Sequence, residues 1–248
     1  MLEARDIAID FGGVKAADGV SFRAEDAQVT GLIGPNGAGK TTVFDIISGF
    51  LRPGRGEISL GGMPIARLDA HEIARLGVGR TFQIIRLFPR MTALDNVLCA
   101  AQKRGDESLW RSLLGIGVSD DELRDRALHL LAQMGLREKA KERAGVLAYG
   151  EQKLLEMARA LMMDPSFLLL DEPLAGVNLE MRTRIAEIVK RFRAEGKGVL
   201  MVEHDMRSVM RLCDRLVVLE FGKVIARGTP AEIQKDERVI EAYLGKEH

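Results

Sequence analysis

The chain has 248 residues, of which 46% are hydrophobic and 29% are charged, and 36 basic residues balance 36 acidic ones. This hydrophobic fraction supports a buried core and excludes an intrinsically disordered chain. Because the formal net charge is zero, we expect no basic surface for nucleic acid. The N-terminus is charged, and no apolar run approaches the roughly 18 residues of a spanning helix. We therefore expect a soluble protein that reaches a membrane only through a partner.

Strand-like and helical patterns alternate along the chain. Residues 1–26 and 56–60 are strand-like, with turns at Gly12-Gly13 and Gly61-Gly62, and predict a small antiparallel sheet. Apolar runs predict four strands, the last three of them buried and parallel, at 29–33, 167–170, 198–202 and 216–219. Helical spacing predicts helices at 41–48, 120–134, 151–163 and 179–195. Strands that alternate with helices indicate an α/β core.

Two regions interrupt this pattern. Residues 84–165 lack apolar strand runs and are mostly helical by spacing, which predicts a helical insertion in the core. Within it, residues 105–119 predict a surface excursion. The only cysteines, Cys99 and Cys213, have no metal-ligand neighbours, and we expect two buried free thiols.

A glycine-rich loop follows the strand predicted at 29–33. Residues 34–41 read Gly-Pro-Asn-Gly-Ala-Gly-Lys-Thr and fit the pattern G-x-x-x-x-G-K-[ST] in full, directly before a predicted helix. The glycines let successive backbone N–H groups face phosphate oxygens, and the helix N-terminus adds its dipole. We expect Lys40 to reach the β- and γ-phosphates and Thr41 to bind Mg²⁺. The predicted nucleotide-binding residues of this loop are Gly34, Pro35, Asn36, Gly37, Ala38, Gly39, Lys40, Thr41 and Thr42.

Two acids end the apolar run 167–170. Because ligands bind at the carboxyl ends of strands in open α/β sheets, Asp171 and Glu172 should lie beside the phosphate loop. Neighbouring strand residues point to opposite faces, which suits two separate tasks. We expect Asp171 to hold Mg²⁺ and Glu172 to act as general base toward the attacking water.

Further motifs follow in a recognisable order. Gln83 ends the sequence Arg-Thr-Phe-Gln at 80–83, His204 follows the apolar run 199–202, and Phe11 precedes Gly12-Gly13. Residues 147–152 read Leu-Ala-Tyr-Gly-Glu-Gln. Together with the phosphate loop and the acid pair, these motifs resemble the ABC ATPase family across essentially the whole chain.

This resemblance implies a fold and a role for each motif. It implies an α/β fold with a P-loop nucleotide-binding core built on a parallel sheet, a small antiparallel β subdomain and an inserted α-helical subdomain. The single ABC ATPase domain would place 1–83 and 166–248 in the core and 84–165 in the helical subdomain. It further implies that Gln83 contacts Mg²⁺ and the attacking water, that His204 touches the γ-phosphate and that Phe11 stacks on adenine. A structural histidine and a core phenylalanine are the alternatives for His204 and Phe11.

The segment 147–152 takes the place of the family signature, which completes the ATP site of a second subunit. The usual signature carries a serine where this chain has Ala148, so a hydroxyl contact to the γ-phosphate is missing. The following helix N-terminus still offers backbone N–H groups. A second departure is Asn178, where the family usually has an aspartate. The implied contact residues of this segment are Ala148, Tyr149, Gly150 and Glu151.

The departures indicate a subfamily. Three features resemble the ATPases of branched-chain amino acid importers. They are Tyr149, the stretch 79–83 with Arg-Leu-Phe at 86–88, and the ending Glu-Ala-Tyr-Leu-Gly at 241–245. This resemblance implies ATP and Mg²⁺ as ligands and a peripheral place on the cytoplasmic face of the inner membrane. The implied partners are a second ABC ATPase in a hetero- or homodimer, two membrane permease subunits and, indirectly, a periplasmic or extracellular substrate-binding protein.

The motifs leave other functions open. One is an ABC ATPase for another cargo, such as urea, short amides or an exported lipid. Its sequence would differ from that of a branched-chain amino acid ATPase only outside the shared motifs. A soluble ABC protein of translation or DNA repair usually has two cassettes or a long coiled coil, and this chain has neither. The acid pair, the signature segment and His204 occur together in this chain, and this combination argues against a P-loop kinase or GTPase.

Overall fold

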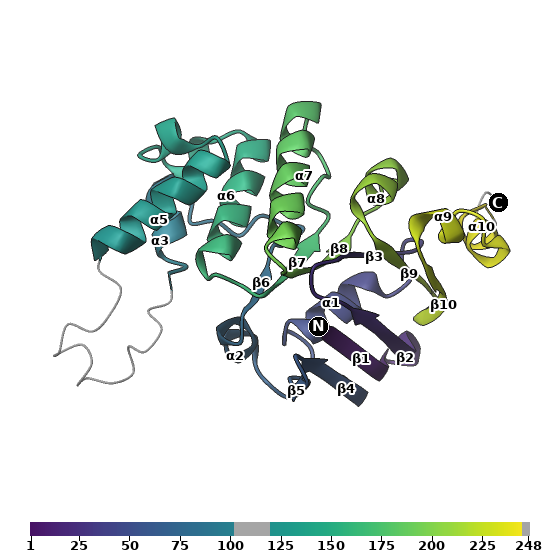
Figure 1. Ribbon diagram of the computed structural model, residues 1–248. Coiled ribbons are helices and arrows are strands. Elements are labelled where there is room, and N and C mark those ends of the chain that lie inside the picture. Colours follow the sequence, from purple (N-terminus) through teal and green to yellow (C-terminus); the bar gives the residue numbers. More distant parts are fainter. Residues whose placement is uncertain (102–119, 245–248) are drawn as a thin grey trace. The chain divides into compact units, whose positions relative to one another are not determined.

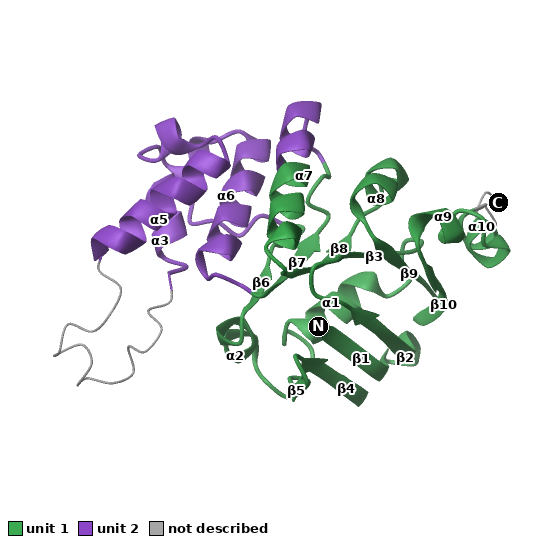
Figure 2. Ribbon diagram, in the orientation of Figure 1, with its two compact units in different colours: residues 1–83, 166–175, 185–248 green, residues 84–165, 176–184 purple. Residues whose placement is uncertain are grey.

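The computed structural model describes residues 1–101 and 120–244 and divides into two compact units, coloured separately in Figure 2. Unit 1 contains Met1–Gln83, Ser166–Ala175 and Ile185–His248, and unit 2 contains Ile84–Pro165 and Gly176–Arg184. The sequence did not indicate that 176–184 would group with the helical unit. The surface excursion predicted at 105–119 lies outside the described residues.

A six-stranded sheet forms the centre of unit 1, in the order β10-β9-β3-β8-β7-β6 (Figure 1). Its strands are β3 (Val29–Ile33), β6 (Val78–Arg80), β7 (Phe167–Asp171), β8 (Gly198–Val202), β9 (Arg215–Glu220) and β10 (Lys223–Gly228). The first five run parallel, and β10 pairs antiparallel with β9. Every residue of β3, β7 and β8 is buried, as expected for strands covered on both faces. The four predicted core strands are confirmed, while β6 and β10 were missed because β6 has only three residues and the apolar run of β10 extends only over 224–226.

The second sheet of unit 1 is antiparallel and has the order β2-β1-β4-β5. Its strands are β1 (Leu2–Phe11), β2 (Val14–Ala24), β4 (Arg55–Leu60) and β5 (Met63–Pro64). Both predicted glycine turns are confirmed, since Phe11 pairs with Val14 and Leu60 pairs with Met63. The predicted α/β fold with a small antiparallel sheet is therefore confirmed.

Helix α1 (Lys40–Ile47) packs against strands of both sheets of unit 1 (Figure 1). Its residues Val43, Phe44, Ile46 and Ile47 are buried in one core cluster with side chains of β1, β2 and β4 and of β3, β7, β8 and β9. The other helices of unit 1 are α2 (Ala70–Arg75), the later turns of α7 (Leu179–Ala194), α8 (Met206–Leu212), α9 (Pro230–Ile233) and α10 (Glu237–Leu244). The phosphate loop thus enters a helix that is held by the main core.

Unit 2 is a packed set of helices. Among its described residues, the helices are α3 (Ala93–Leu98), α5 (Asp120–Gln133), α6 (Tyr149–Met162) and the first turns of α7, with 3-10 turns at Arg137–Lys139 and Ala144–Val146. The fully buried Asn96 donates from Nδ2 to the carbonyl oxygens of Phe88 and Thr92, each at 3.0 Å, and so fixes the start of the unit. Helix α6 was predicted from residue 151 but begins at Tyr149, so the middle of the signature segment is helical.

The two cysteines differ in exposure. Cys213 is buried, and burial raises the pKa of its thiol to about 12, but Cys99 is exposed, so the prediction of two buried thiols was wrong for Cys99. In residues 1–101 and 120–244, no helix combines the length and the apolar character needed to cross a membrane.

Candidate functional site

The phosphate loop connects β3 to α1 and depends on glycine at defined positions. Gly34, Gly37 and Gly39 have φ angles of 149°, 77° and 99°. A Cβ atom on Gly34 would lie 2.0 Å from the Leu219 carbonyl oxygen, and one on Gly39 would lie 2.1 Å from the Ala16 carbonyl oxygen. The loop therefore packs against its neighbours without room for a side chain, while Gly37 at its tip is exposed and has open space beside it.

Lys40 is the first residue of α1 and is only 6% exposed. Its Nζ donates to the carbonyl oxygens of Gly34 and Pro35, each at 2.8 Å, so the ammonium group lies over the loop. Gly39 precedes the helix and has no side chain to cap the first-turn N–H groups, which include those of Thr41 and Thr42. A buried ammonium group beside an uncapped helix N-terminus is suited to bind phosphate oxygens.

Two elements from the C-terminal part of the chain support this loop. The N–H of Gly222, in the turn between β9 and β10, donates to the Ala38 carbonyl oxygen at 3.1 Å. Burial raises the pKa of the Tyr243 phenol on α10, and the nearby Gly34 backbone opposes part of that rise. Tyr243, one of the residues that indicated the subfamily, therefore lies beside the phosphate loop.

The acid pair lies at the end of β7, as predicted, but its two members differ in conformation. Asp171 ends the strand and is 4% exposed, and burial raises the pKa of its carboxyl group while the Arg80 guanidinium opposes that rise. Glu172 lies beyond the strand with φ of 47°, a left-handed conformation that is costly for a residue with a side chain. The direction of the Glu172 side chain is therefore set by this turn. The expectation that Asp171 and Glu172 point to opposite faces as neighbouring residues of one strand was wrong.

Gln83 and His204 both contact the carboxylate of Glu172. Gln83 Nε2 donates to Glu172 Oε2 at 3.2 Å, and His204 Nε2 lies 2.9 Å from Glu172 Oε1. The three residues follow three neighbouring strands, β6, β7 and β8, at their carboxyl ends. The structure thus brings together the three side chains that the sequence singled out for catalysis.

Two charged residues near this cluster were missed by the sequence reasoning. The carboxylate of Glu203, 4% exposed, accepts hydrogen bonds from the Leu174 N–H at 2.7 Å and the His204 N–H at 3.3 Å. It ties the segment after β7 to the segment after β8. Arg80, at the end of β6, contacts Asp171. Glu203 could have been found from its place directly after the apolar run 199–202. No local sequence pattern indicated a role for Arg80.

The signature residues lie in unit 2, and the phosphate loop lies in unit 1. Ala148 precedes α6, and its N–H donates to Glu151 Oε2 at 3.1 Å, while Lys139 Nζ lies 2.7 Å from Glu151 Oε1. These two contacts hold the pKa of Glu151 below its usual value, with the lysine as the larger cause. The Glu151 carboxylate thus caps the helix. Tyr149 is exposed, and Gly150 is buried where a Cβ would lie 2.0 Å from Met181 Sδ.

Phe11 ends β1 at the tip of the β1–β2 hairpin and is 49% exposed. This exposure excludes the alternative of a core phenylalanine. An exposed ring on a hairpin tip can supply a stacking surface for a planar ligand.

The donor set at the strand ends fits a Mg²⁺ ion that is shared with a nucleotide. In the described part of the chain, no three His, Cys, Asp or Glu side chains gather into a group that could hold a metal ion by themselves. Mg²⁺ is commonly bound by one or two carboxylates together with substrate phosphates, and Asp171 with the Thr41 hydroxyl supplies that partial set.

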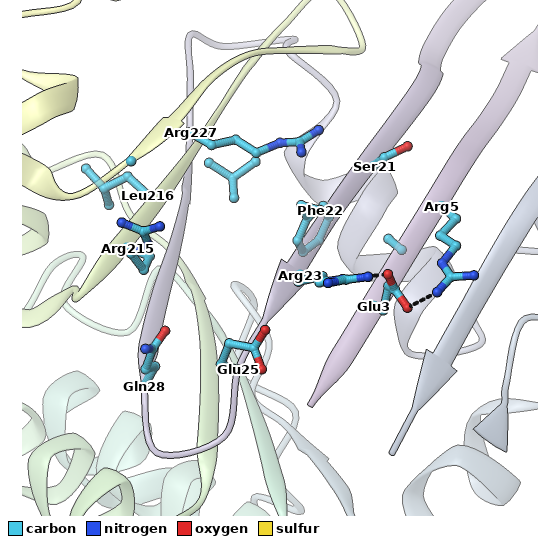
Figure 3. Close-up of a pocket in the computed structure, with 13 residues that line it drawn as sticks. Glu3, Arg5, Ser21, Phe22, Arg23, Glu25, Gln28, Arg215, Leu216 and Arg227 are labelled. Carbon is cyan, nitrogen blue, oxygen red and sulfur yellow. Dashed lines mark hydrogen bonds and ion pairs between the residues drawn. The ribbon is translucent and has the colours of Figure 1, made fainter. Parts of the chain in front are cut away.

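A separate cavity of about 490 Å³ lies between the two sheets of unit 1, and Figure 3 shows its lining. Glu3 pairs there with Arg5 and Arg23 at 2.7 and 2.6 Å, and Arg215 and Arg227 lie on the opposite wall. Arg215 begins β9, so the cavity lies at the amino end of a parallel strand, whereas the phosphate loop and the catalytic cluster follow carboxyl ends. The cavity is therefore not part of the site described above.

Comparisons with known proteins agree with this geometry. A family model described as ABC transporter matches residues 17–175, and one described as branched-chain amino acid ATP-binding cassette transporter matches residues 223–248. The high-affinity branched-chain amino acid transport ATP-binding protein BraF of Pseudomonas aeruginosa is 42% identical over 99% of this chain and 98% of its own length. The corresponding LivG protein of Escherichia coli is 39% identical with the same coverage.

Solved structures give the same result. A crystal structure of an ATP-binding cassette of an ABC transporter in its ADP conformation has a TM-score of 0.85 and 33% identity, covering 99% of both chains. A nucleotide-free ATP-binding cassette from an ABC transporter has a TM-score of 0.86 and 32% identity with the same coverage. The chain therefore belongs to the ABC transporter family and is an ATP-hydrolysing cassette of that family.

Proposed function

We propose that this chain is the ATPase subunit of an importer for branched-chain amino acids. The observation that carries this proposal is the match of residues 223–248 to the branched-chain family model, at the end of a chain that resembles BraF and LivG over 99% of its length. In this proposal the cassette lies at the cytoplasmic face of the membrane. It works with a second cassette, two permease subunits and, indirectly, a periplasmic or extracellular binding protein.

ATP binds with its phosphates on the loop 34–41 in this proposal. Lys40 exchanges its contacts with two loop carbonyls for contacts with the β- and γ-phosphate oxygens, and the N–H groups of Thr41 and Thr42 donate to the same phosphates. Phe11 stacks on the adenine ring. The uncapped start of α1 and the buried ammonium of Lys40 support this assignment.

The metal is assigned to Thr41, Asp171 and Gln83. When bound together with the phosphates, Mg²⁺ neutralises the charge that develops on their oxygens during phosphoryl transfer. The structure supports Asp171 best, because it is buried at the end of β7 and faces the counter-charge of Arg80.

Hydrolysis is assigned to Glu172, which takes the proton of the attacking water. The water oxygen forms a bond to the γ-phosphorus, the bond to the β–γ bridging oxygen breaks, and ADP and inorganic phosphate result. Gln83 and His204 hold the carboxylate for this step, as their contacts at 3.2 and 2.9 Å suggest. His204 additionally lies at a strand end from which it can contact the γ-phosphate.

The second cassette completes the site in this proposal. Its signature helix closes over the γ-phosphate of the ATP held here, and residues 148–151 of this chain serve the partner's ATP in return. Because Ala148 has no hydroxyl, this chain offers the weaker signature, and we propose a heterodimer whose other member carries the fuller one. Loss of the γ-phosphate then opens the dimer and moves the permease subunits.

A second candidate is an ATPase for another cargo. The lipopolysaccharide export system ATP-binding protein LptB of Acidithiobacillus ferridurans is 38% identical over 91% of this chain, a value close to that of LivG. Export of a lipid is therefore one alternative, and import of urea or short amides is another that the shared motifs leave open. The branched-chain match at 223–248 favours the importer.

Uptake by intact cells distinguishes these cargoes. Cells that lack this chain are expected to lose ATP-driven uptake of radiolabelled leucine, isoleucine and valine. The wild-type chain restores this uptake, while Glu172→Gln does not, because that variant binds ATP without hydrolysing it. Urea and acetamide uptake and lipid export serve as controls. Unchanged leucine uptake together with a defect in one of the controls would assign the other cargo instead.

A further inference from the structure

Arg80 is a buried cation near the proposed metal site for which the proposed reaction assigns no role. It ends β6, three residues before Gln83, and its side chain is only 8% exposed. Burying an arginine is costly unless acidic groups and hydrogen-bond acceptors surround it. The partners of Arg80 therefore indicate what it holds in place.

Four polar contacts fix the guanidinium group. Its Nη2 lies 2.7 Å from Asp45 Oδ1 and 3.5 Å from Asp171 Oδ2. Its Nη1 donates to the carbonyl oxygen of Phe44, at 3.4 Å, and to Ser48 Oγ. Because the guanidinium is planar and its donors have a fixed geometry, contacts on two nitrogens set its orientation as well as its position.

Three aromatic rings enclose the same group. The guanidinium carbon lies 4.9 Å from the ring centroid of Phe82, 5.4 Å from that of Phe50 and 5.9 Å from that of Phe44. Phe50 and Phe82 also pack edge to face, with centroids 5.6 Å apart. The rings attract the cation and keep water away, which strengthens its contact with the carboxylates.

These contacts join three segments that serve the proposed reaction. Asp45 lies on α1, the helix that begins at Lys40, and Asp171 ends β7. Next to Arg80, Thr81 accepts a hydrogen bond on Oγ1 from the Asp171 N–H at 3.4 Å, and its own N–H donates to the Leu169 carbonyl oxygen at 3.0 Å. The chain that leads to Gln83 is thereby attached to both α1 and β7.

We propose that Arg80 is a positioning residue that holds one carboxylate oxygen of Asp171 and so presents the carboxylate to the metal of bound Mg-nucleotide. Arg80 touches neither the nucleotide nor the metal; it acts through Asp171. The inference rests on the proposed role of Asp171 as a metal ligand. A purely structural arginine would instead change stability and nucleotide affinity without a specific effect on the metal.

Metal binding to the ADP complex separates these two roles, because no hydrolysis is involved. We expect Arg80→Met to bind ADP in the presence of EDTA as the wild type does, and to bind Mn²⁺ in the ADP complex roughly 10- to 100-fold more weakly. Free Mn²⁺ is measured by electron paramagnetic resonance with the protein in excess over ADP. Arg67→Met, which removes an exposed arginine of unit 1, is the matched control and should behave as the wild type.

Two further variants complete the test. Arg80→Lys keeps the charge but cannot contact both acids and Ser48 at once, so it should weaken Mn²⁺ binding too, and it decides the question if Arg80→Met does not fold. Mn²⁺ binding as tight as wild type in a folded Arg80 variant overturns the inference. Asp171→Asn is the reference: if it loses Mn²⁺ binding while the Arg80 variants keep it, only the role of Arg80 fails. If Asp171→Asn binds Mn²⁺ like the wild type, the proposed metal site itself is wrong.

Discussion

Replacing Glu172 by glutamine is expected to lower the rate of ATP hydrolysis by roughly 10²- to 10⁴-fold, the range typical for loss of a general base. The amide has the size of the carboxylate but cannot accept the proton of the attacking water. ATP binding should be unchanged, because the phosphate contacts come from the loop and Lys40. Phosphate release at saturating Mg-ATP measures the rate, and the fluorescence of a labelled ATP analogue measures binding.

The control for this variant is Glu180→Gln on α7, whose side chain is 80% exposed and lies outside the catalytic cluster. It should hydrolyse ATP at the wild-type rate. We also expect Glu172→Gln with ATP to stay associated with a second cassette, because the γ-phosphate is retained. Hydrolysis at the wild-type rate by Glu172→Gln would show that Glu172 is not the base.

Replacing Lys40 by alanine is expected to weaken ATP binding by about 100-fold or more. Hydrogen bonds from a charged donor contribute roughly 1.5–3 kcal/mol each, and losing two of them corresponds to at least that factor. The loop should keep its fold, since its shape depends on glycines packed against Leu219 and Ala16. Equilibrium titration with a labelled ATP analogue measures the affinity, and the thermal midpoint checks folding.

Lys190→Ala is the matched control, because Lys190 is an exposed lysine on α7. Its ATP affinity should equal that of the wild type. A folded Lys40→Ala variant with wild-type affinity would mean that the loop does not hold the phosphates as proposed.

The phosphate loop and the core strands could be predicted because their signals are local. The loop is a contiguous motif between a strand and a helix, and the buried strands are nearly continuous apolar runs. The proximity of Glu172 and His204 also followed from a local signal, since each comes after a predicted strand and parallel strands end at one edge of the sheet. The strand before Gln83 was not predicted, and only the family resemblance indicated the place of Gln83.

The remaining features depend on contacts that no local pattern carries. Arg80 is surrounded by residues of α1, by Phe82 and by Asp171, which lies 91 positions away in the sequence. The direction of Glu172 comes from its φ of 47°, a turn conformation that the strand pattern conceals. Helix α6 begins early because Glu151 caps it through the Ala148 N–H, although alanine is not a typical capping residue.

The central claim is that Gln83 and His204 act as one unit by holding the two oxygens of the Glu172 carboxylate. The measurement that tests it most directly is the hydrolysis rate of Gln83→Ala, His204→Ala and the double variant at saturating Mg-ATP. If the carboxylate needs both contacts, the double variant should be no slower than the slower single variant. If the two losses multiply in the double variant, the residues act independently and the account of this site is contradicted.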